Sequence, residues 1–367
     1  MKIQVNLLTV SALLITLIFS SCKSPVQPKE ENLVGEKGFF LLSEGAWGAN
    51  NASLDFYNCE TGEYLQNIFS RINPNIVGGL GDVGNDLQIY GSRLYAVINY
   101  SNYVEVMDLK GRHIGEIEVK NCRKIAFCNG KAYITSYGDA IYGDGEHNGF
   151  VAEIDTADLK IKRTIEVGYQ PDGLAVFGGK IYVANSGGYC QTYANTLSII
   201  DIENFTERKI VSALNCQIVE QDNNGNLFMI SNGNYADVNA AIYKVNMQTE
   251  SIEKIDIFAS NFCISDGNLY ILSNNTNWET GETVAKKYVV YNIDSKRITS
   301  ENFITDGTEH EIQLSYGIAV NPVTKEILIT DQKRGTSVGE VFCFSPDGVQ
   351  LWKQTTGIFP KYAAFLK

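Results

Sequence analysis

Residues that commonly perform catalysis are scarce in this 367-residue chain, which contains only three histidines, His113, His147 and His310. A metal site built from several histidines is therefore excluded, and any Ser-His-Asp arrangement would have to use one of these three. The sequence contains no phosphate-binding glycine loop, dinucleotide-binding motif or nucleophile elbow. We therefore predict that the protein is not an enzyme and holds neither a catalytic cofactor nor a metal.

Aromatic residues recur instead in a series of loops that are rich in Gly, Asn and Ser. Rigid rings among small hydrogen-bonding residues suit the recognition of a bulky ligand, because they supply contact area at low entropic cost. The predicted ligand-binding rings are Trp47, Tyr100, Tyr137, Tyr142, Tyr189, Tyr193, Tyr235 and Trp278. For each ring the alternative is that it packs inward and contributes to the core.

A repeated pattern of short strands positions these loops. A Gly or polar turn followed by an alternating strand recurs along the chain, as in 130–136 (GKAYITS), 179–185 (GKIYVAN) and 225–231 (GNLFMIS). The large residue that marks each strand falls at positions 95, 133, 182, 228, 270 and 328. A unit of four short strands in about 40–50 residues is the period of a β-propeller blade.

The two ends of the domain complement each other. The first unit has strands at 39–42, 53–57 and 64–68 but lacks an innermost strand, whereas the last apolar segment, 362–366, has no unit of its own. We predict that the C-terminal strand pairs into the first blade and closes the ring, which removes open sheet edges. The predicted fold class is all-β, a seven-bladed β-propeller of four-stranded antiparallel blades over residues 38–367.

The connections of such blades alternate between the two faces of the ring. First-to-second connections are short hairpin turns such as 129–130 (NG), and the aromatic loops are all second-to-third connections on the opposite face. Arg334 lies in the seventh of these loops, which has no aromatic residue. Arg123 and Asp172 stand at the starts of innermost strands, which open on the same face, so we add these three residues to the predicted ligand site.

The composition limits the partners. The chain carries 42 acidic residues against 30 Lys and Arg, with a net charge of −12, which argues against nucleic acid as a ligand. Seven cysteines follow Cys22, and they include no Cys-x-x-Cys pair. We expect buried free thiols and no disulfide framework, with a single bridge left open.

The N-terminus has the layout of an export signal. Lys2 precedes an apolar run over 7–19 that is too short to span a membrane, and two serines follow. Cys22, directly after them, resembles the lipid-bearing residue of the bacterial lipobox; the alternative is an ordinary signal peptide with an incidental Cys. We predict a signal peptide over 1–21, a lipid anchor on Cys22 and a flexible tether over 22–37.

Several segments resemble known propeller families. The runs 84–91 (GNDLQIYG), 167–174 (VGYQPDGL) and 181–189 (IYVANSGGY) resemble the YncE-like seven-bladed propellers. Within that group, 80–83 (LGDV), 303–309 (FITDGTE) and 316–322 (YGIAVNP) resemble the BtuG-type surface lipoproteins that capture cobalamin.

This resemblance covers roughly residues 38–367 and has specific implications. It implies an outer-membrane lipoprotein, facing the cell surface, that binds cobalamin or a related corrinoid and delivers it to a TonB-dependent transporter. The segment 29–31 (KEE) is similar to the acidic signal that sends lipoproteins to the outer surface. Two alternatives stay open at this point: a propeller that binds surface glycans, and a propeller lyase-type enzyme.

Overall fold

The computed structural model describes residues 33–139, 141, 147–190, 192–277, 282–335 and 337–366. Residues 33–367 form one compact unit. The predicted signal peptide and Cys22 lie outside the described residues. Within the described part of the chain, no helix is both long enough and apolar enough to cross a membrane.

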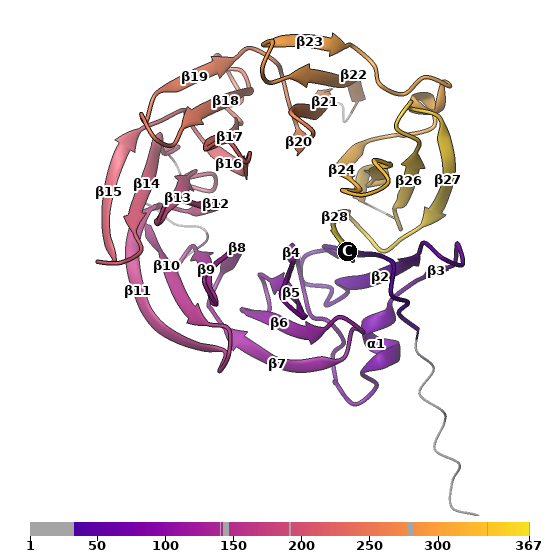
Figure 1. The fold of residues 1–367 in the computed structure, drawn as a ribbon, viewed down its shortest axis with the longest axis horizontal. Coiled ribbons are helices and arrows are strands. Elements are labelled where there is room, and N and C mark those ends of the chain that lie inside the picture. Colours follow the sequence, from indigo (N-terminus) through magenta and orange to yellow (C-terminus); the bar gives the residue numbers. More distant parts are fainter. Residues whose placement is uncertain are drawn as a thin grey trace, which may run out of the picture. The chain divides into compact units, whose positions relative to one another are not determined.

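Seven four-stranded antiparallel sheets form a ring, with one strand of each sheet nearest the centre (Figure 1). From the centre outward, the first blade contains β28 (Pro360–Phe365), β1 (Gly38–Ser43), β2 (Ser53–Asn58) and β3 (Tyr64–Leu65). The second contains β4 (Gly84–Tyr90), β5 (Arg93–Ile98), β6 (Tyr103–Asp108) and β7 (His113–Glu118). The third contains β8 (Cys122–Cys128), β9 (Lys131–Ser136), β10 (Asn148–Asp155) and β11 (Lys160–Tyr169).

The other four blades repeat this order. The fourth contains β12 (Pro171–Phe177), β13 (Lys180–Asn185), β14 (Thr196–Asp201) and β15 (Thr206–Val211), and the fifth contains β16 (Cys216–Gln221), β17 (Asn226–Ser231), β18 (Ala241–Asn246) and β19 (Ile252–Ile255). The sixth contains β20 (Asn261–Ser265), β21 (Asn268–Asn277), β22 (Glu282–Asn292) and β23 (Arg297–Ser300). The seventh contains β24 (Ser315–Val320), β25 (Ile327–Asp331), β26 (Glu340–Phe344) and β27 (Gln350–Thr355).

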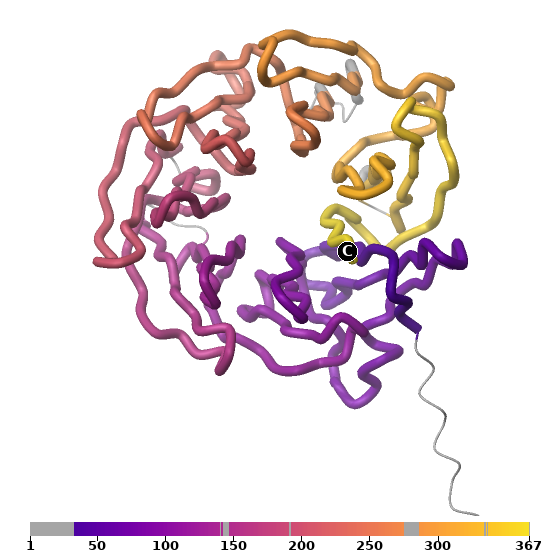
Figure 2. Tube along the Cα trace, in the orientation of Figure 1, coloured from indigo at the N-terminus to yellow at the C-terminus, as the bar shows by residue number. Residues whose placement is uncertain are grey.

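The C-terminal strand closes the ring as predicted. β28 pairs antiparallel with β1, with Phe39 opposite Phe365 and Leu42 opposite Tyr362. The first strand and the last strand of the described chain therefore meet in one blade, as the Cα trace also shows (Figure 2). The predicted seven-bladed all-β fold is confirmed.

The core lies in layers between neighbouring blades. Leu42 and Phe56 of the first blade, for example, pack in one buried cluster with Leu94 and Ile98 of the second. Second strands such as β1 and β17 are buried along their whole length, whereas the outer strand β15 is partly or fully exposed throughout. Burial on both faces explains why the second strands read as the most apolar segments of the repeat.

The short turns follow the sequence prediction. Asn129 and Gly130, between β8 and β9, have φ values of 49° and 75°, the left-handed conformation that a tight two-residue hairpin requires. The third strand of the first blade was predicted to reach Ile68, and this was wrong. β3 ends at Leu65, and Asn67, with φ 48° and its N–H bonded to Asp55 Oδ1 at 2.8 Å, starts the short helix α1 (Ile68–Ile72).

Candidate functional site

The predicted aromatic loops share one end of the ring. β1, β5, β9, β13 and β17 all run toward this end, so the loops that follow them lie together there. We call this end the aromatic face. The first-to-second turns, such as Asn129-Gly130, lie at the opposite end.

β-Bulges in the innermost strands build the floor of the aromatic face. In the second blade Gly84 pairs with Ile98 and Asp86 with Val97, so that Asn85 stands outside the ladder. Five more innermost strands are interrupted at the same place, whereas the register of β20 is continuous. The residues outside the ladder there are Arg123, Lys124, Asp172, Gly173, Gln217, Ile218, Tyr316, Gly317 and Lys361.

The bulges point these side chains in a new direction. A bulge places two residues opposite one and turns a side chain out of the regular alternation. Thr135 holds the bulge of β8, because its Oγ1 accepts the N–H of Lys124 at 3.0 Å and donates to the carbonyl of Asp172 at 2.8 Å. Thr330 holds the N–H of Gly317 in the same way at 2.7 Å. The N–H groups of Lys124 and Gly317 at these two bulges are therefore satisfied by threonine side chains.

Apart from the two glycines, all the bulge residues line a cavity of about 460 Å³ on the aromatic face. Loop residues, among them Trp47, Asn99, Tyr189 and Asn232, form its walls. This volume is within the range of small-molecule sites, which is about 300–1,000 Å³.

The structure brings five of the predicted ligand-binding residues into this cavity: Trp47, Tyr137, Tyr189, Arg123 and Asp172. Three others do not line it: Tyr100 packs on Trp47 of the cavity wall, and Tyr193 and Tyr235 pack on each other on the same face. Tyr142, Trp278 and the side chain of Arg334 lie outside the described residues.

The rings of neighbouring loops pack in pairs around the cavity. Trp47 meets Tyr100 edge-on with ring centroids 5.6 Å apart, and Tyr193 meets Tyr235 at 6.0 Å. Trp47 and Tyr235 are each 61% exposed. Exposed rings held by neighbouring rings offer a prearranged apolar surface.

Tyr137 differs from the other rings, because it is 1% exposed and packs inward. Its hydroxyl donates to Asp172 Oδ2 at 2.9 Å, and its ring lies 6.2 Å from that of Tyr189. Tyr137 therefore packs into the core, which was the alternative given for each ring, and it also forms part of the cavity wall.

Arg123 and Asp172 form a buried ion pair beside Tyr137. The Nη2 to Oδ2 distance is 3.0 Å, and the guanidinium lies over the Tyr137 ring, 4.6 Å from its centroid. Burial raises the pKa of Asp172, but the charges of Arg123 and Lys124 outweigh this effect and leave the pKa below its ordinary value. Asp172 is thus ionised at neutral pH.

Glu44 plays the matching role on the other side of the cavity. It accepts the hydroxyl of Tyr316 at 2.8 Å and lies 3.3 Å from the Nζ of Lys361. The ammonium of Lys361 also lies 4.4 Å from the centroid of the Tyr316 ring. These contacts tie the loop after β1 to β24 and β28.

Sequence reasoning missed Glu44, Lys124, Tyr316 and Lys361 as site residues. Residues at the start of an innermost strand point to this face, which is why the sequence analysis selected Arg123 and Asp172. Applied to every blade, the same rule finds Lys124, Tyr316 and Lys361. Glu44 does not start an innermost strand, but it begins the aromatic loop that contains Trp47, and this position was the signal that could have identified it.

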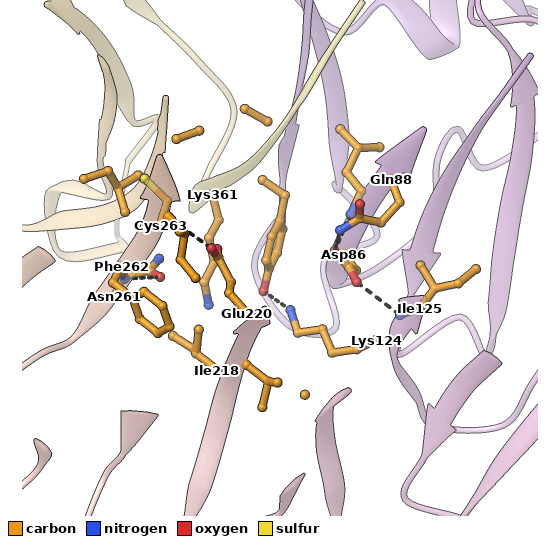
Figure 3. Close-up of a pocket in the computed structure, with 18 of the residues that line it drawn as sticks. Asp86, Gln88, Lys124, Ile125, Ile218, Glu220, Asn261, Phe262, Cys263 and Lys361 are labelled. Atoms are coloured by element: carbon orange, nitrogen blue, oxygen red, sulfur yellow. Dashed lines mark hydrogen bonds between the residues drawn. The ribbon is translucent and has the colours of Figure 1, made fainter. Parts of the chain in front are cut away.

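A second cavity of about 280 Å³ continues from the floor into the central channel (Figure 3). The two cavities share Lys124, Ile218, Lys361 and Tyr362. Glu220 lies in the channel, where burial raises its pKa to about 7.

A group of metal-ligand type lies on the outer strands of the second blade, among the described residues. The ligand atoms of Glu105, His113 and Glu116 are within 4.8 Å of one another. His113 Nδ1 already pairs with Glu105 Oε1 at 2.7 Å, which accounts for the buried carboxylate without an ion.

Several solved structures share this fold. A quinonprotein alcohol dehydrogenase-like protein from Bacteroides thetaiotaomicron aligns with a TM-score of 0.59 and 16% identity over 90% of this chain and 79% of its own. A protein from Lactobacillus plantarum aligns with a TM-score of 0.59 and 11% identity, over 90% and 99% of the two chains. Hydrazine synthase from Kuenenia stuttgartiensis aligns with a TM-score of 0.56 and 15% identity, over 72% and 77%.

At these identities the three structures establish a common fold and nothing about a ligand. No curated protein matches the chain by sequence. The model of one family, described as a domain of unknown function, DUF5074, matches residues 37–353. The chain therefore belongs to the DUF5074 family of β-propeller domains.

Proposed function

We propose that this protein binds a corrinoid, cobalamin or a close relative, on its aromatic face and carries out no chemistry on it. The observation that carries the proposal is the pairing of exposed rings around a cavity with a polar and charged floor. A corrinoid has a broad apolar macrocycle with amide groups at its edge and a phosphodiester in its nucleotide arm. Each of these groups has a counterpart on the aromatic face.

The macrocycle suits the rim. Trp47 and Tyr189 line the cavity opening and Tyr100 extends the surface of Trp47, so that a flat ligand can lie against several rings at once. Peripheral amides would bond to Asn85, Asn99 and Gln217, which also line the cavity. A corrinoid is larger than the cavity, so the macrocycle would cover the rim while a side arm enters.

The choice of ligand depends on the resemblance to BtuG-type proteins, because a propeller by itself is compatible with many functions. The segments that carry this resemblance include Tyr316, which lines the cavity. The same resemblance supports an outer-membrane lipoprotein that is anchored through Cys22 at the cell surface and passes its ligand to a TonB-dependent transporter.

The arrangement of the described chain ends is compatible with this role. β1 begins at Gly38 and β28 ends at Phe365, both at the face opposite the aromatic loops. Lys110 holds the incoming segment there by bonds to the carbonyls of Val34 at 3.2 Å and Gly35 at 3.3 Å. The aromatic face is therefore clear of both ends of the described chain.

A visible-absorbance titration of the purified protein with cobalamin tests the proposal. We expect saturable binding, and a loss of affinity of at least about 30-fold in the double variant Trp47→Ala/Tyr100→Ala, because the two paired rings together should contribute about 2 kcal/mol or more to binding. Leu351→Ala is the control, since Leu351 is an exposed apolar residue on the outer strand β27.

Equal affinity of the double variant and the wild type, or no binding of several corrinoids, would contradict the proposal. In the latter case a glycan array decides whether the same rings bind a sugar surface. Protease treatment of intact cells tests the proposed location, because a surface protein is cleaved without lysis.

A further inference from the structure

The cavity of about 460 Å³ on the aromatic face, called here the upper cavity, has an excess of positive charge in its lining. It contains three cations, Arg123, Lys124 and Lys361, and two carboxylates, Glu44 and Asp172. The whole chain has a net charge of −12, so a cationic cavity departs from the general character of the molecule. Such a local excess favours an anionic ligand group.

The excess positive charge comes from Lys124, because the other two cations are paired. Arg123 is paired with Asp172, and Lys361 is paired with Glu44. Lys124, in contrast, forms no ion pair within the part of the chain that the structure describes. Of the three cations that line this cavity, Lys124 is therefore the one without an ion-paired carboxylate, and the nearest compensating charge is that of Asp86 in the adjoining channel.

The hydrogen bonds of Lys124 leave part of this ammonium unused. Its Nζ donates to the carbonyl of Asn85 and, at 2.9 Å, to the hydroxyl of Tyr362, and it lies 4.1 Å from the centroid of the Tyr362 ring. An ammonium has three N–H donors, and these two bonds use two of them. The buried Nε of Arg123, the neighbouring residue, also has no acceptor among the described residues.

A purely structural role would explain the two bonds that Lys124 makes, since they link β8 to β4 and β28. It would not explain why a charged group was needed for bonds that a neutral donor can make, because burying an unpaired charge costs free energy. Lys124 also lines both the upper cavity and the channel (Figure 3). Its position therefore gives a ligand in the cavity access to it.

We propose that Lys124 is the anion-binding group of this cavity, and that it binds the phosphodiester of the corrinoid whose nucleotide arm enters from the rim. The assignment of the anion to a corrinoid arm rests on the proposed function. The anion site itself rests only on the charges and contacts of the cavity.

The charge on Lys124 depends on pH in the accessible range. Burial lowers its pKa to about 8, with Lys361 and Arg123 acting in the same direction and Asp86 and Asp172 opposing them. Lys124 is charged below this pH and becomes neutral above it. Anion binding should therefore be retained at pH 7 and lost as the pH rises through about 8 toward 9.5.

The test compares cobalamin with cobinamide, which lacks the nucleotide arm and its phosphodiester. In the wild type we expect cobalamin to bind at least about tenfold more tightly, the size of one charge-assisted hydrogen bond. Lys124→Met should remove this preference and leave the affinity for cobinamide unchanged, whereas Lys124→Arg should keep most of it. Lys120→Met is the matched control, because Lys120 lies four residues earlier and pairs with Asp139.

Calorimetry with inorganic phosphate separates this inference from the proposed function. Phosphate binding by the wild type and not by Lys124→Met supports the anion site even if no corrinoid binds. If corrinoids bind but Lys124→Met keeps the full preference for cobalamin, the anion site is refuted and the proposed function stands. Should Lys124→Met fail to fold, the wild type decides: a cobalamin-to-cobinamide affinity ratio that is the same at pH 7 and pH 9.5 overturns the proposal.

Discussion

Single carboxylates organise the floor of the aromatic face. Asp172 joins the third and fourth blades through Arg123 and Tyr137, whereas Glu44, paired with Lys361 of its own blade, joins the first and seventh through Tyr316. Each carboxylate accepts the hydroxyl of a ring that lines the cavity, Tyr137 for Asp172 and Tyr316 for Glu44. The floor therefore keeps its shape through charged contacts between blades rather than through apolar packing alone.

Asp172→Asn should destabilise the protein by about 3 kcal/mol at pH 7, because it leaves the buried guanidinium of Arg123 without a counter-charge. The pKa of Asp172 lies below its ordinary value in the folded protein. Its contribution to stability is therefore complete above about pH 4 and is lost as the pH falls through the folded pKa. Urea unfolding at several pH values measures both effects.

The exposed pair of Asp158 and Lys162, 2.6 Å apart, supplies the control for this experiment. Asp158→Asn should leave the urea midpoint unchanged, since exposed pairs contribute little. An equal response of the two variants, or a difference between wild type and Asp172→Asn that persists in strong acid, would disprove the role given to the buried pair.

Among the strands, β28 matters most for closure of the ring. It is the innermost strand of a blade whose other strands come from the opposite end of the sequence. Its Ala364 is 7% exposed, lies opposite Phe40 and packs in the cluster between the first and second blades. Without this strand β1 would present an open edge beside a buried apolar layer.

Ala364→Asp should therefore prevent ring closure or lower the unfolding free energy by more than about 3 kcal/mol, because an unpaired carboxylate is placed in an apolar layer. Thermal unfolding followed by circular dichroism measures this. Val211→Asp is the control, as Val211 ends the outer strand β15 and is 75% exposed. A similar melting temperature for the two variants would mean that β28 does not hold the ring closed.

The molecule as a whole is a closed ring in which each blade packs against two neighbours. Its buried cysteines report on this arrangement, because Cys122, Cys216, Cys263 and Cys343 are free, buried thiols in four different blades. Burial also raises the pKa of each of them, to about 12 for Cys122 and Cys216. None should react while the ring is folded.

Pulse labelling with iodoacetamide in increasing urea should expose all four thiols at one urea concentration, because a closed ring has no terminal blade that can open first. Mass spectrometry of the labelled peptides gives the four midpoints, and the exposed Cys59 serves as the site that labels before unfolding. Midpoints that separate blade by blade would show that the ring opens in steps.

The sequence by itself determined the architecture and placed the aromatic loops at one end of the ring. The repeat of strands and turns predicted the number of blades, and the unpaired segment at 362–366 predicted the closure by β28, because a missing strand and an extra strand are complementary. Loop composition placed Trp47, Tyr100 and Tyr189 on one face. These features are local or periodic, so they can be recognised in one amino-acid sequence without knowledge of the tertiary contacts.

Only the tertiary structure decided which side chains share the cavity. Lys124 and Tyr362 are separated by 238 residues yet meet at 2.9 Å, and a bulge, which leaves no mark in the strand alternation, turns Lys124 into the cavity. The inward packing of Tyr137 depends in the same way on Asp172, a residue of the next blade. Such contacts form only when the ring closes and neighbouring blades meet. The charge of the site therefore depends on distances between residues that are far apart in the sequence, and no local sequence pattern encodes these distances.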